Sequence, residues 1–254
     1  MAVIAGTTSC DDFLDREPMS SISPETYYST AAQLEANLND EYPNVLPSFG
    51  QWTYGIFGED KGTDNQIEVN ANDRYTQDRW KVPHSESDNW KFERIYRINF
   101  FLSEALPKFG EDMSGSQNTI SGSVATIKHY IGEMYFLRAY EYFKKLQLFG
   151  DFPIINQPLA DEMEALREAS KRFPRNEVAR FIISDLDKAY AYMSDVDMAT
   201  TRINKDAAML VKSRVALFEA TWLQNFKGTA FVPGGEGWPG ASLHNNYQLS
   251  LIHI

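Results

Sequence analysis

The sequence predicts an all-α protein, in which helices pair into a repeat array and long irregular loops join them. Five segments carry apolar residues at the spacing of three and four residues that is typical of amphipathic helices. One of these segments is apolar on two sides, which indicates a helix packed between others. The predicted helices also follow one another at loosely similar spacing, as antiparallel pairs in helical repeats do.

The first predicted helix begins with Ser23 as N-cap and Pro24 at the first helical position, and both residue types favour helix starts there. We expect it to end near Pro43, because proline disfavours continuation of a helix. Its apolar face comprises Tyr27, Ala31, Leu34 and Leu38. Residues 43–87 then show no sustained helical period and predict a long irregular loop, rich in Gly, Asp, Asn and aromatic residues.

The second predicted helix runs from about Asp88 to the residue before Pro107. One side of it comprises Ile95, Ile98, Leu102 and Leu106. A polar segment rich in Gly and Ser follows between Ser114 and Ser123, and it predicts a loop before the next helix.

The third predicted helix, from Val124 to Phe149, has the clearest pattern. Its first stripe comprises Ile127, Ile131, Met134, Tyr135, Arg138 and Tyr142, and its second comprises Gly132, Phe136, Ala139 and Phe143. The small residues of the second stripe predict close approach of a neighbouring helix. Arg138 is expected to pair with an internal carboxylate, because an unpaired buried guanidinium is costly. Gly150 ends the helix as a C′ glycine, and residues 152–155 continue as an extended segment.

The fourth predicted helix spans about Asn176 to Met193, and Asn204 caps the fifth. The fourth carries its apolar residues in register: Val178, Phe181, Ile182, Leu186, Ala189 and Met193. The fifth carries Ala207, Leu210, Val211, Arg214, Phe218 and Trp222. Together the two segments predict the last helical pair of the array.

Composition excludes some classes of partner. A formal charge of −11 argues against nucleic acids and anionic lipid surfaces, whose phosphates require patches of Lys and Arg. No run approaches the roughly 18 apolar residues of a membrane-spanning helix. Aromatic residues reach 13%, and they provide either packing bulk between helices or stacking platforms for a ring-shaped ligand.

Cys10 is the only cysteine, and Asp11 and Asp12 follow it directly. A lone cysteine forms no internal disulfide, and no metal ligands are suitably spaced around it. The small, mildly apolar residues 1–9 are typical of the end of a bacterial lipoprotein signal, but too few for a complete one. We therefore expect residues 1–10 to be a truncated signal and Cys10 to be its lipid attachment point, rather than a stray thiol.

The last residues, Leu249–Ile254, match a translation of a transposon-type sequencing adapter. We expect this segment to be non-native, in preference to a genuine short C-terminal strand. Residues 11–248 then form the helical domain.

A set of motifs occurs in order over nearly the whole chain: Cys10–Pro18, Trp90, Ile95–Asn99, Gly132–Ala139, Tyr142, Phe149–Pro153, Arg175, Val178, Phe181–Leu186, Arg202–Ala208 and Arg214–Val215. In this order they resemble the SusD/RagB family of outer-membrane nutrient-binding lipoproteins of Bacteroidetes. The chain has about half the usual length of that family, and the resemblance covers the N-terminal, helical half.

The resemblance implies a SusD-like fold of tetratricopeptide-like helical pairs with irregular ligand-binding loops. It implies capture of oligosaccharides, or in some members of peptides or glycopeptides, by a lipoprotein exposed on the outer membrane. It also implies a partner, a SusC-like TonB-dependent transporter that receives the ligand. Aspartates after the lipid-bearing cysteine are similar to the signal that sends such lipoproteins to the cell surface.

The ligand residues are expected in the loop between the first two helices. Aromatic faces bind the C–H surfaces of sugars, and carboxylate, amide and guanidinium groups bind their hydroxyls. Residues 49–90 hold this mixture: Trp52, Tyr54, Asp60, Asp64, Asn65, Asn70, Asn72, Arg74, Tyr75, Trp80 and Trp90. We predict Asp64 and Asn65 as hydroxyl partners and Tyr75 and Trp80 as stacking groups. The alternatives are that Asp64 and Asn65 form turns, that Trp52 and Tyr54 cover an apolar edge and that Trp90 anchors the core.

The sequence contains no catalytic constellation. The four histidines are scattered, without a paired-histidine helix motif or a Gly-x-Ser-x-Gly elbow. Paired acids such as Glu59-Asp60 are typical of solvated loops, although a glycosidase also needs two carboxyl groups. The Pro233–Gly240 segment lacks the Gly-Lys-Ser/Thr ending of a nucleotide-binding loop, so we expect turns there, with Trp238 exposed near the ligand face.

We therefore predict a binding protein without cofactor, metal or catalytic residues. A carbohydrate-active enzyme is the less favoured alternative, and a helical scaffold for a protein partner is a third.

Overall fold

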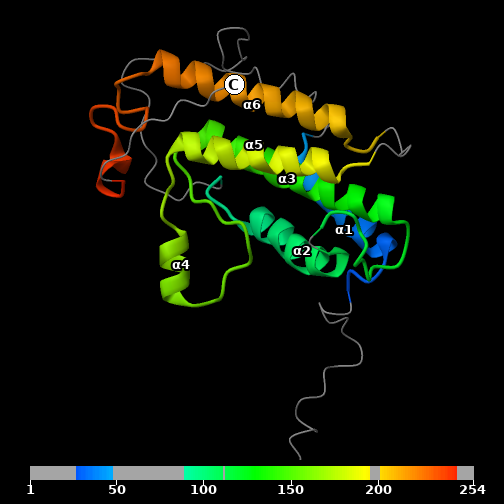
Figure 1. The fold of residues 1–254 in the computed structure, drawn as a ribbon. Helices are drawn as coiled ribbons and strands as arrows, with labels where there is room; N and C mark the ends of the chain where they lie inside the picture. Colours follow the sequence, from blue (N-terminus) through cyan, green and yellow to red (C-terminus); the bar gives the residue numbers. More distant parts are fainter. Residues whose placement is uncertain (1–26, 48–88, 111, 195–200, 245–254) are drawn as a thin grey trace, which may run out of the picture.

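The computed structural model describes residues 27–47, 89–110, 112–194 and 201–244. These ranges contain α1 (Ala31–Val45), α2 (Glu93–Phe109), α3 (Val124–Phe149), α4 (Met163–Ala169), α5 (Arg175–Tyr192), α6 (Lys205–Asn225) and a short 3-10 helix, η4 (Pro239–Ser242). Extended pairing in the same ranges is limited to two isolated bridges. The all-α class that the sequence predicts is confirmed (Figure 1).

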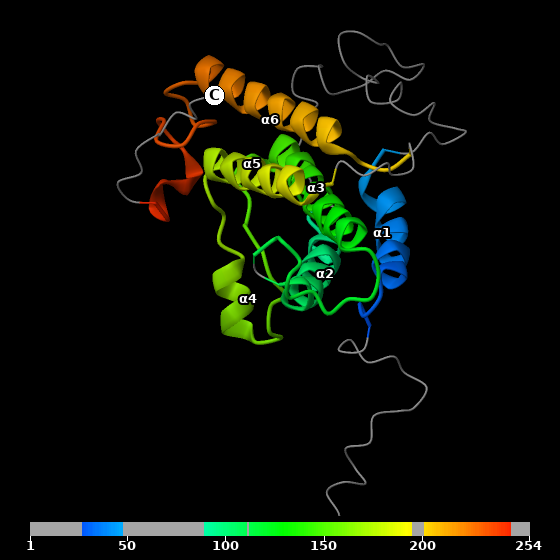
Figure 2. The ribbon, with the colours of Figure 1, turned by 45° about the vertical axis from the view of Figure 1, so that its right-hand side comes forward.

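Helix α3 lies at the centre of the stack. It packs against α1, α2 and α5, and α5 in turn packs against α6. Figures 1 and 2 show α6 as the outermost layer beyond α5, with α1 and α2 on the opposite side of α3 and the short α4 set apart. Such successive packing of neighbouring helices is consistent with the predicted tetratricopeptide-like array.

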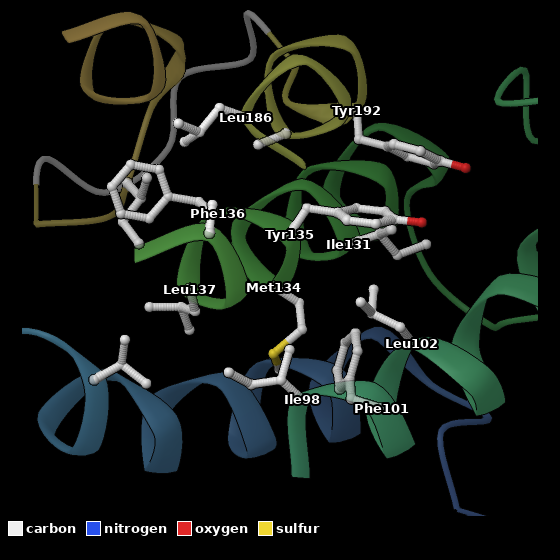
Figure 3. Close-up of a cluster of buried hydrophobic side chains, with 14 of the residues drawn as sticks. Ile98, Phe101, Leu102, Ile131, Met134, Tyr135, Phe136, Leu137, Leu186 and Tyr192 are labelled. Atoms are coloured by element: carbon white, nitrogen blue, oxygen red, sulfur yellow. The ribbon is translucent and has the colours of Figure 1, made fainter. Parts of the chain in front are cut away.

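Both sides of α3 are buried in apolar packing. Met134 points toward Ile98 and Phe101 of α2 (Figure 3). On the opposite side the ring of Tyr135 stacks on that of Tyr192 in α5, with centroids 5.6 Å apart. Each fully buried side chain of this size contributes about 1.5–3 kcal/mol. The prediction of a helix packed between others is therefore confirmed.

Helices α3 and α5 come unusually close at Gly132. A Cβ atom built on Gly132 would lie 2.8 Å from the Met193 backbone nitrogen and 2.9 Å from the Ala189 carbonyl oxygen. Both atoms belong to the last turn of α5 and its C-cap, so they cannot rotate away as a side chain would. The close approach that the small residues predict is thus present at this position.

Two helices continue past prolines at which the sequence predicts an end. Helix α1 includes Pro43 and reaches Val45. Its last turn is held because Val45 is only 2% exposed and because Lys144 Nζ donates to the Val45 carbonyl at 2.8 Å. Helix α2 includes Pro107 and ends with Phe109, which is fully buried. In both cases burial of the last residue outweighs the single hydrogen bond that proline removes.

The start of α1 also differs from the prediction. Residues 27 and 28 form a turn, and Thr30 pairs with Ser121 in an isolated bridge. Helix α1 begins only after Thr30, whose side chain accepts from the Gln33 backbone N–H. The Gln33 side chain accepts from the Thr30 N–H in return, so the pair forms a capping box. The predicted cap and proline, Ser23 and Pro24, lie outside the described residues.

Helix α4 was not predicted from the sequence. It has seven residues and buries none of them, and Met163 is 82% exposed. A helix without a buried face has no apolar period to detect.

A buried ion pair joins α3 to α5. Arg138 donates to Asp185 through Nε at 2.6 Å and through Nη2 at 2.8 Å. Its Nη1 donates to the Asn99 side chain at 2.9 Å and to the Asn156 carbonyl at 3.1 Å. Arg138 is 3% exposed and Asp185 is fully buried. The predicted internal carboxylate partner of Arg138 is therefore Asp185.

A second, partly buried ion pair ties α3 to the segment before α6. Glu133 accepts from Arg202 Nε at 2.8 Å and from Nη2 at 2.6 Å. The Tyr42 hydroxyl donates to Glu133 at 2.8 Å and accepts from the Ile203 N–H at 3.0 Å. These contacts hold together α1, α3 and the segment before α6, which lie far apart in the sequence.

Buried tyrosines predict loss of stability at high pH. Burial raises the pKa of Tyr28 and of Tyr135 to about 12, against about 10 in an unfolded chain. The neutral hydroxyl is favoured in the fold, so its contribution is complete below about pH 10 and is lost as pH rises toward about 12.

We expect denaturant unfolding to show falling stability across this window, with a smaller fall in Tyr28→Phe, which keeps the ring. Tyrosinate absorbance is expected to follow unfolding. Full ionisation of a protein that stays folded, as judged by circular dichroism, would contradict this.

Candidate functional site

Every residue to which the sequence assigns a binding or attachment role lies outside the described part of the chain: Cys10, Asp64, Asn65, Tyr75 and Trp80. Residues 249–254 lie outside it as well. Their predicted roles stay predictions.

Trp90 is described, and its surroundings favour the interpretation as a core anchor. Its ring packs edge-on against Phe149 and Phe152, with centroids 4.8 and 4.9 Å apart. The guanidinium carbon of Arg172 lies over the Trp90 ring, 4.7 Å from its centroid. Trp90 thus fixes the position of a cation rather than offering a free face to a ligand.

A cavity of about 520 Å³ lies where the end of α3, the start of α5 and the end of α6 meet the loop 226–244. Small-molecule sites commonly measure about 300–1,000 Å³. The lining comprises Leu146, Gln147, Leu148, Phe149, Gly150, Asp151, Arg172, Arg175, Trp222, Ala230, Phe231, Trp238, Pro239, Gly240 and Leu243. These residues combine aromatic rings with carboxylate and guanidinium groups, and we take the cavity as the candidate site.

Asp151 joins the parts of the cavity wall. One carboxylate oxygen accepts from the Arg175 backbone N–H, at the first residue of α5, at 2.9 Å. The other accepts from the Trp238 indole N–H at 2.7 Å. A carboxylate at a helix N-terminus satisfies a free backbone donor and the helix dipole. Asp151 therefore holds the loop 226–244 against the start of α5.

Arg175 forms the buried floor of the cavity. It donates to Glu219 of α6 through Nε at 3.0 Å and through Nη2 at 2.9 Å. The Trp222 ring covers its guanidinium, 4.1 Å from carbon to centroid. Burial raises the pKa of the Glu219 carboxyl, and Arg175 opposes that shift. The remaining nitrogen, Nη1, lies beside Gly150, where an added Cβ would be 3.5 Å away.

Three exposed apolar side chains surround the cavity. Leu148, Phe231 and Leu243 are 58%, 63% and 55% exposed, and all three belong to the lining. Isolated exposed apolar residues are normal on a protein surface, whereas a group of them around a concavity is a common feature of interaction sites.

The expected exposure of Trp238 is wrong. Trp238 is only 5% exposed, because its ring packs against His244, with centroids 5.9 Å apart, and against Gly240. The exposed aromatic residue of this loop is Phe231, which the sequence did not single out. The only local signal was the turn-rich character of residues 233–240.

Neither a metal cluster nor a membrane span occurs in the described ranges. No group of three or more His, Cys, Asp or Glu side chains there could hold a metal ion. Likewise, none of the helices in these ranges is long and apolar enough to cross a membrane.

Curated relatives match most of the chain. SusD-like protein P2 of Formosa agariphila is 26% identical, over 94% of this chain and 46% of its own length. SusD-like protein P25 of the same organism is 25% identical, over 84% of this chain and 41% of its own length. The chain therefore spans less than half the length of these relatives.

Solved structures share the fold. A SusD-like protein of Bacteroides fragilis matches 84% of this chain and 39% of its own, at 20% identity and a TM-score of 0.53. A SusD-like carbohydrate binding protein of the same species covers 80% of this chain and 40% of its own, at 19% identity and a TM-score of 0.51. A SusD-like carbohydrate binding protein of Bacteroides vulgatus covers 77% and 43%, at 15% identity and a TM-score of 0.51.

A sequence model of the SusD-like family, described as starch-binding and associating with the outer membrane, matches residues 12–217. That range includes α1, α2, α3, α4 and α5 in full and most of α6. The chain therefore belongs to the SusD-like family.

Proposed function

We propose that this chain is the helical portion of a cell-surface lipoprotein that captures oligosaccharides and delivers them to a SusC-like TonB-dependent transporter. The family match over residues 12–217 is the observation that carries the proposal, because the family is described as starch-binding and associating with the outer membrane. Two structural neighbours from Bacteroides are themselves named carbohydrate binding proteins. Capture without bond cleavage is the activity that follows.

The proposed ligand contacts lie in the segment before α2. Asp64 and Asn65 would bind sugar hydroxyls, and Tyr75 and Trp80 would stack on the C–H faces of sugar rings. Cys10 would carry the lipid anchor. One acyl chain gives only reversible membrane binding, whereas several chains give durable anchoring of an otherwise water-soluble polypeptide.

Titration calorimetry with maltohexaose tests capture. Trp80→Ala is expected to raise the Kd about tenfold or more, which corresponds to about 1.4 kcal/mol, because a stacking face is lost. The melting temperature is expected to stay unchanged. Leu210→Ala, at an exposed position on α6 and outside that segment, is the control.

An unchanged Kd in Trp80→Ala would remove Trp80 from the site. Absence of binding to maltohexaose and to other neutral oligosaccharides would contradict the proposed capture, and binding of peptides instead would favour a RagB-like uptake protein. Release of shorter sugars during incubation, detected by chromatography, would show an enzyme.

A further inference from the structure

The cavity at the start of α5 has the features of a carbohydrate subsite. We propose that it binds one neutral pyranose ring of an oligosaccharide, with Phe231 as the stacking face and with Arg172 and Arg175 as hydroxyl donors. This inference rests on the proposed function and adds to it a second set of contacts, on residues remote in sequence from Asp64 and Trp80.

Phe231 is the ring that can stack on a sugar. It is 63% exposed, and its only described ring neighbour is Phe226, which it meets edge-on at 5.7 Å between centroids. A T-shaped contact covers at most one face of the Phe231 ring and leaves the other available. By contrast, the indole of Trp222 packs between Arg175 and Phe226. Trp238 is almost fully buried.

The two arginines supply donors that are already held in place. Arg175 is 4% exposed, and Glu219 accepts hydrogen bonds from its Nε and Nη2. Its Nη1 donates to no acceptor in the described ranges and lies on the cavity wall beside Gly150. Because the other nitrogens fix the guanidinium, little conformational entropy is lost when Nη1 binds a hydroxyl.

Arg172 is fixed in a different way. Its guanidinium stacks on Trp90, which orients the planar group and leaves its N–H donors at the edges. Among the residues that the structure describes, Arg172 forms no ion pair with a carboxylate. A polar ligand in the cavity therefore meets a guanidinium that the Trp90 ring orients and that pairs with no carboxylate in the described ranges.

The charges around the cavity favour a neutral ligand. Asp151 and Glu219 carry two negative charges, and Arg172 and Arg175 carry two positive charges, so the formal charges cancel. An ionic ligand would meet a charge of its own sign as well as one of the opposite sign, and it would still lose hydration. A sugar ring offers an apolar C–H face and several hydroxyls, which match an aromatic ring beside positioned donors.

A protein partner fits the same surface less well. Protein interfaces need broad contact of about 800 Å² on each side, whereas the rim residues Leu148, Phe231 and Leu243 surround a concavity with polar groups at its floor. Apolar walls with a few fixed polar groups are typical of small-molecule sites.

The test compares variants of the full chain by calorimetry with maltohexaose, cellohexaose and xylohexaose. Phe231→Ala is expected to raise the Kd for the bound sugar about tenfold, and Phe231→Trp to retain binding because the stacking face is kept. Arg172→Ala is expected to raise the Kd severalfold. Leu210→Ala is the control, because Leu210 is 73% exposed on α6 and lies outside the cavity lining. Thermal melts check that each variant is folded.

An unchanged Kd in Phe231→Ala, together with weakened binding in Trp80→Ala, would overturn the subsite and leave the proposed function intact. Absence of binding in the unmodified chain would contradict both. Preference for oligogalacturonate, lost in Arg172→Ala, would replace the neutral ligand with an acidic one. Retention of a protein through Phe231, without sugar binding, would overturn the subsite in favour of a docking surface.

Discussion

Asp185→Ala is expected to lower the free energy of unfolding by about 3–5 kcal/mol, because it leaves Arg138 charged and buried without its counter-ion. Arg138 is 3% exposed. Its remaining acceptors, the Asn99 side chain and the Asn156 carbonyl, are neutral, and both accept from Nη1. Nε and Nη2 would lose the carboxylate to which they donate, at a position that is almost fully buried. The expected loss in the free energy of unfolding is therefore far larger than the loss from removing one partner of an exposed ion pair.

Urea unfolding followed by circular dichroism measures this effect. Asp187→Ala is the matched control on the same helix, since Asp187 is 54% exposed and pairs at the surface with Lys212. That pair is expected to contribute about 0–1 kcal/mol. Replacement of both buried partners, in Arg138→Met with Asp185→Leu, should recover most of the stability lost in Asp185→Ala. A loss below about 1 kcal/mol for Asp185→Ala would show that water reaches the pair.

The buried pair shows how far sequence can predict this fold. Arg138 lies on a stripe of apolar residues, and that pattern is sufficient to predict an internal carboxylate partner. It cannot identify Asp185, which is 47 positions away; the partner depends on how α5 crosses α3. Patterns within one helix are local, whereas pairing between helices is a tertiary property.

Helix ends show the same limit. The third predicted helix has the observed bounds of α3, because a polar start and Gly150 coincide with the ends of its apolar period. Pro43 and Pro107 mislead because the cost of proline is local, while the compensating burial of Val45 and Phe109 involves other helices.

The candidate cavity was beyond prediction because its wall is assembled from separate segments. Asp151 follows α3, Arg175 starts α5, and Trp238 lies beyond α6, yet two hydrogen bonds join all three. The sequence indicated only a turn-rich loop at residues 233–240, and it predicted exposure for the buried Trp238 instead of for Phe231. The residues it did single out, such as Trp80, belong to a segment with many polar and aromatic side chains.

Gly132→Leu is the other substitution with a large expected effect, because α3 and α5 pack closely at this position. Even a Cβ atom would lie 2.8 Å from the Met193 nitrogen and 2.9 Å from the Ala189 carbonyl oxygen. Overpacking in a core typically costs about 1–3 kcal/mol, and here the obstructing atoms are backbone. We expect a loss of about 3 kcal/mol or more for Gly132→Leu.

Gly132→Ala separates the packing cost from helix propensity. In an open helix this change would stabilise by about 1 kcal/mol, so a net loss at Gly132 measures the clash directly. Ser213→Leu, at an exposed position within α6, is the control for adding a large apolar side chain and should change stability by less than about 0.5 kcal/mol. Both are measured by urea unfolding. Stabilisation by Gly132→Ala would mean that α5 is free to move away from α3, and that the close approach at Gly132 does not determine how the two helices pack.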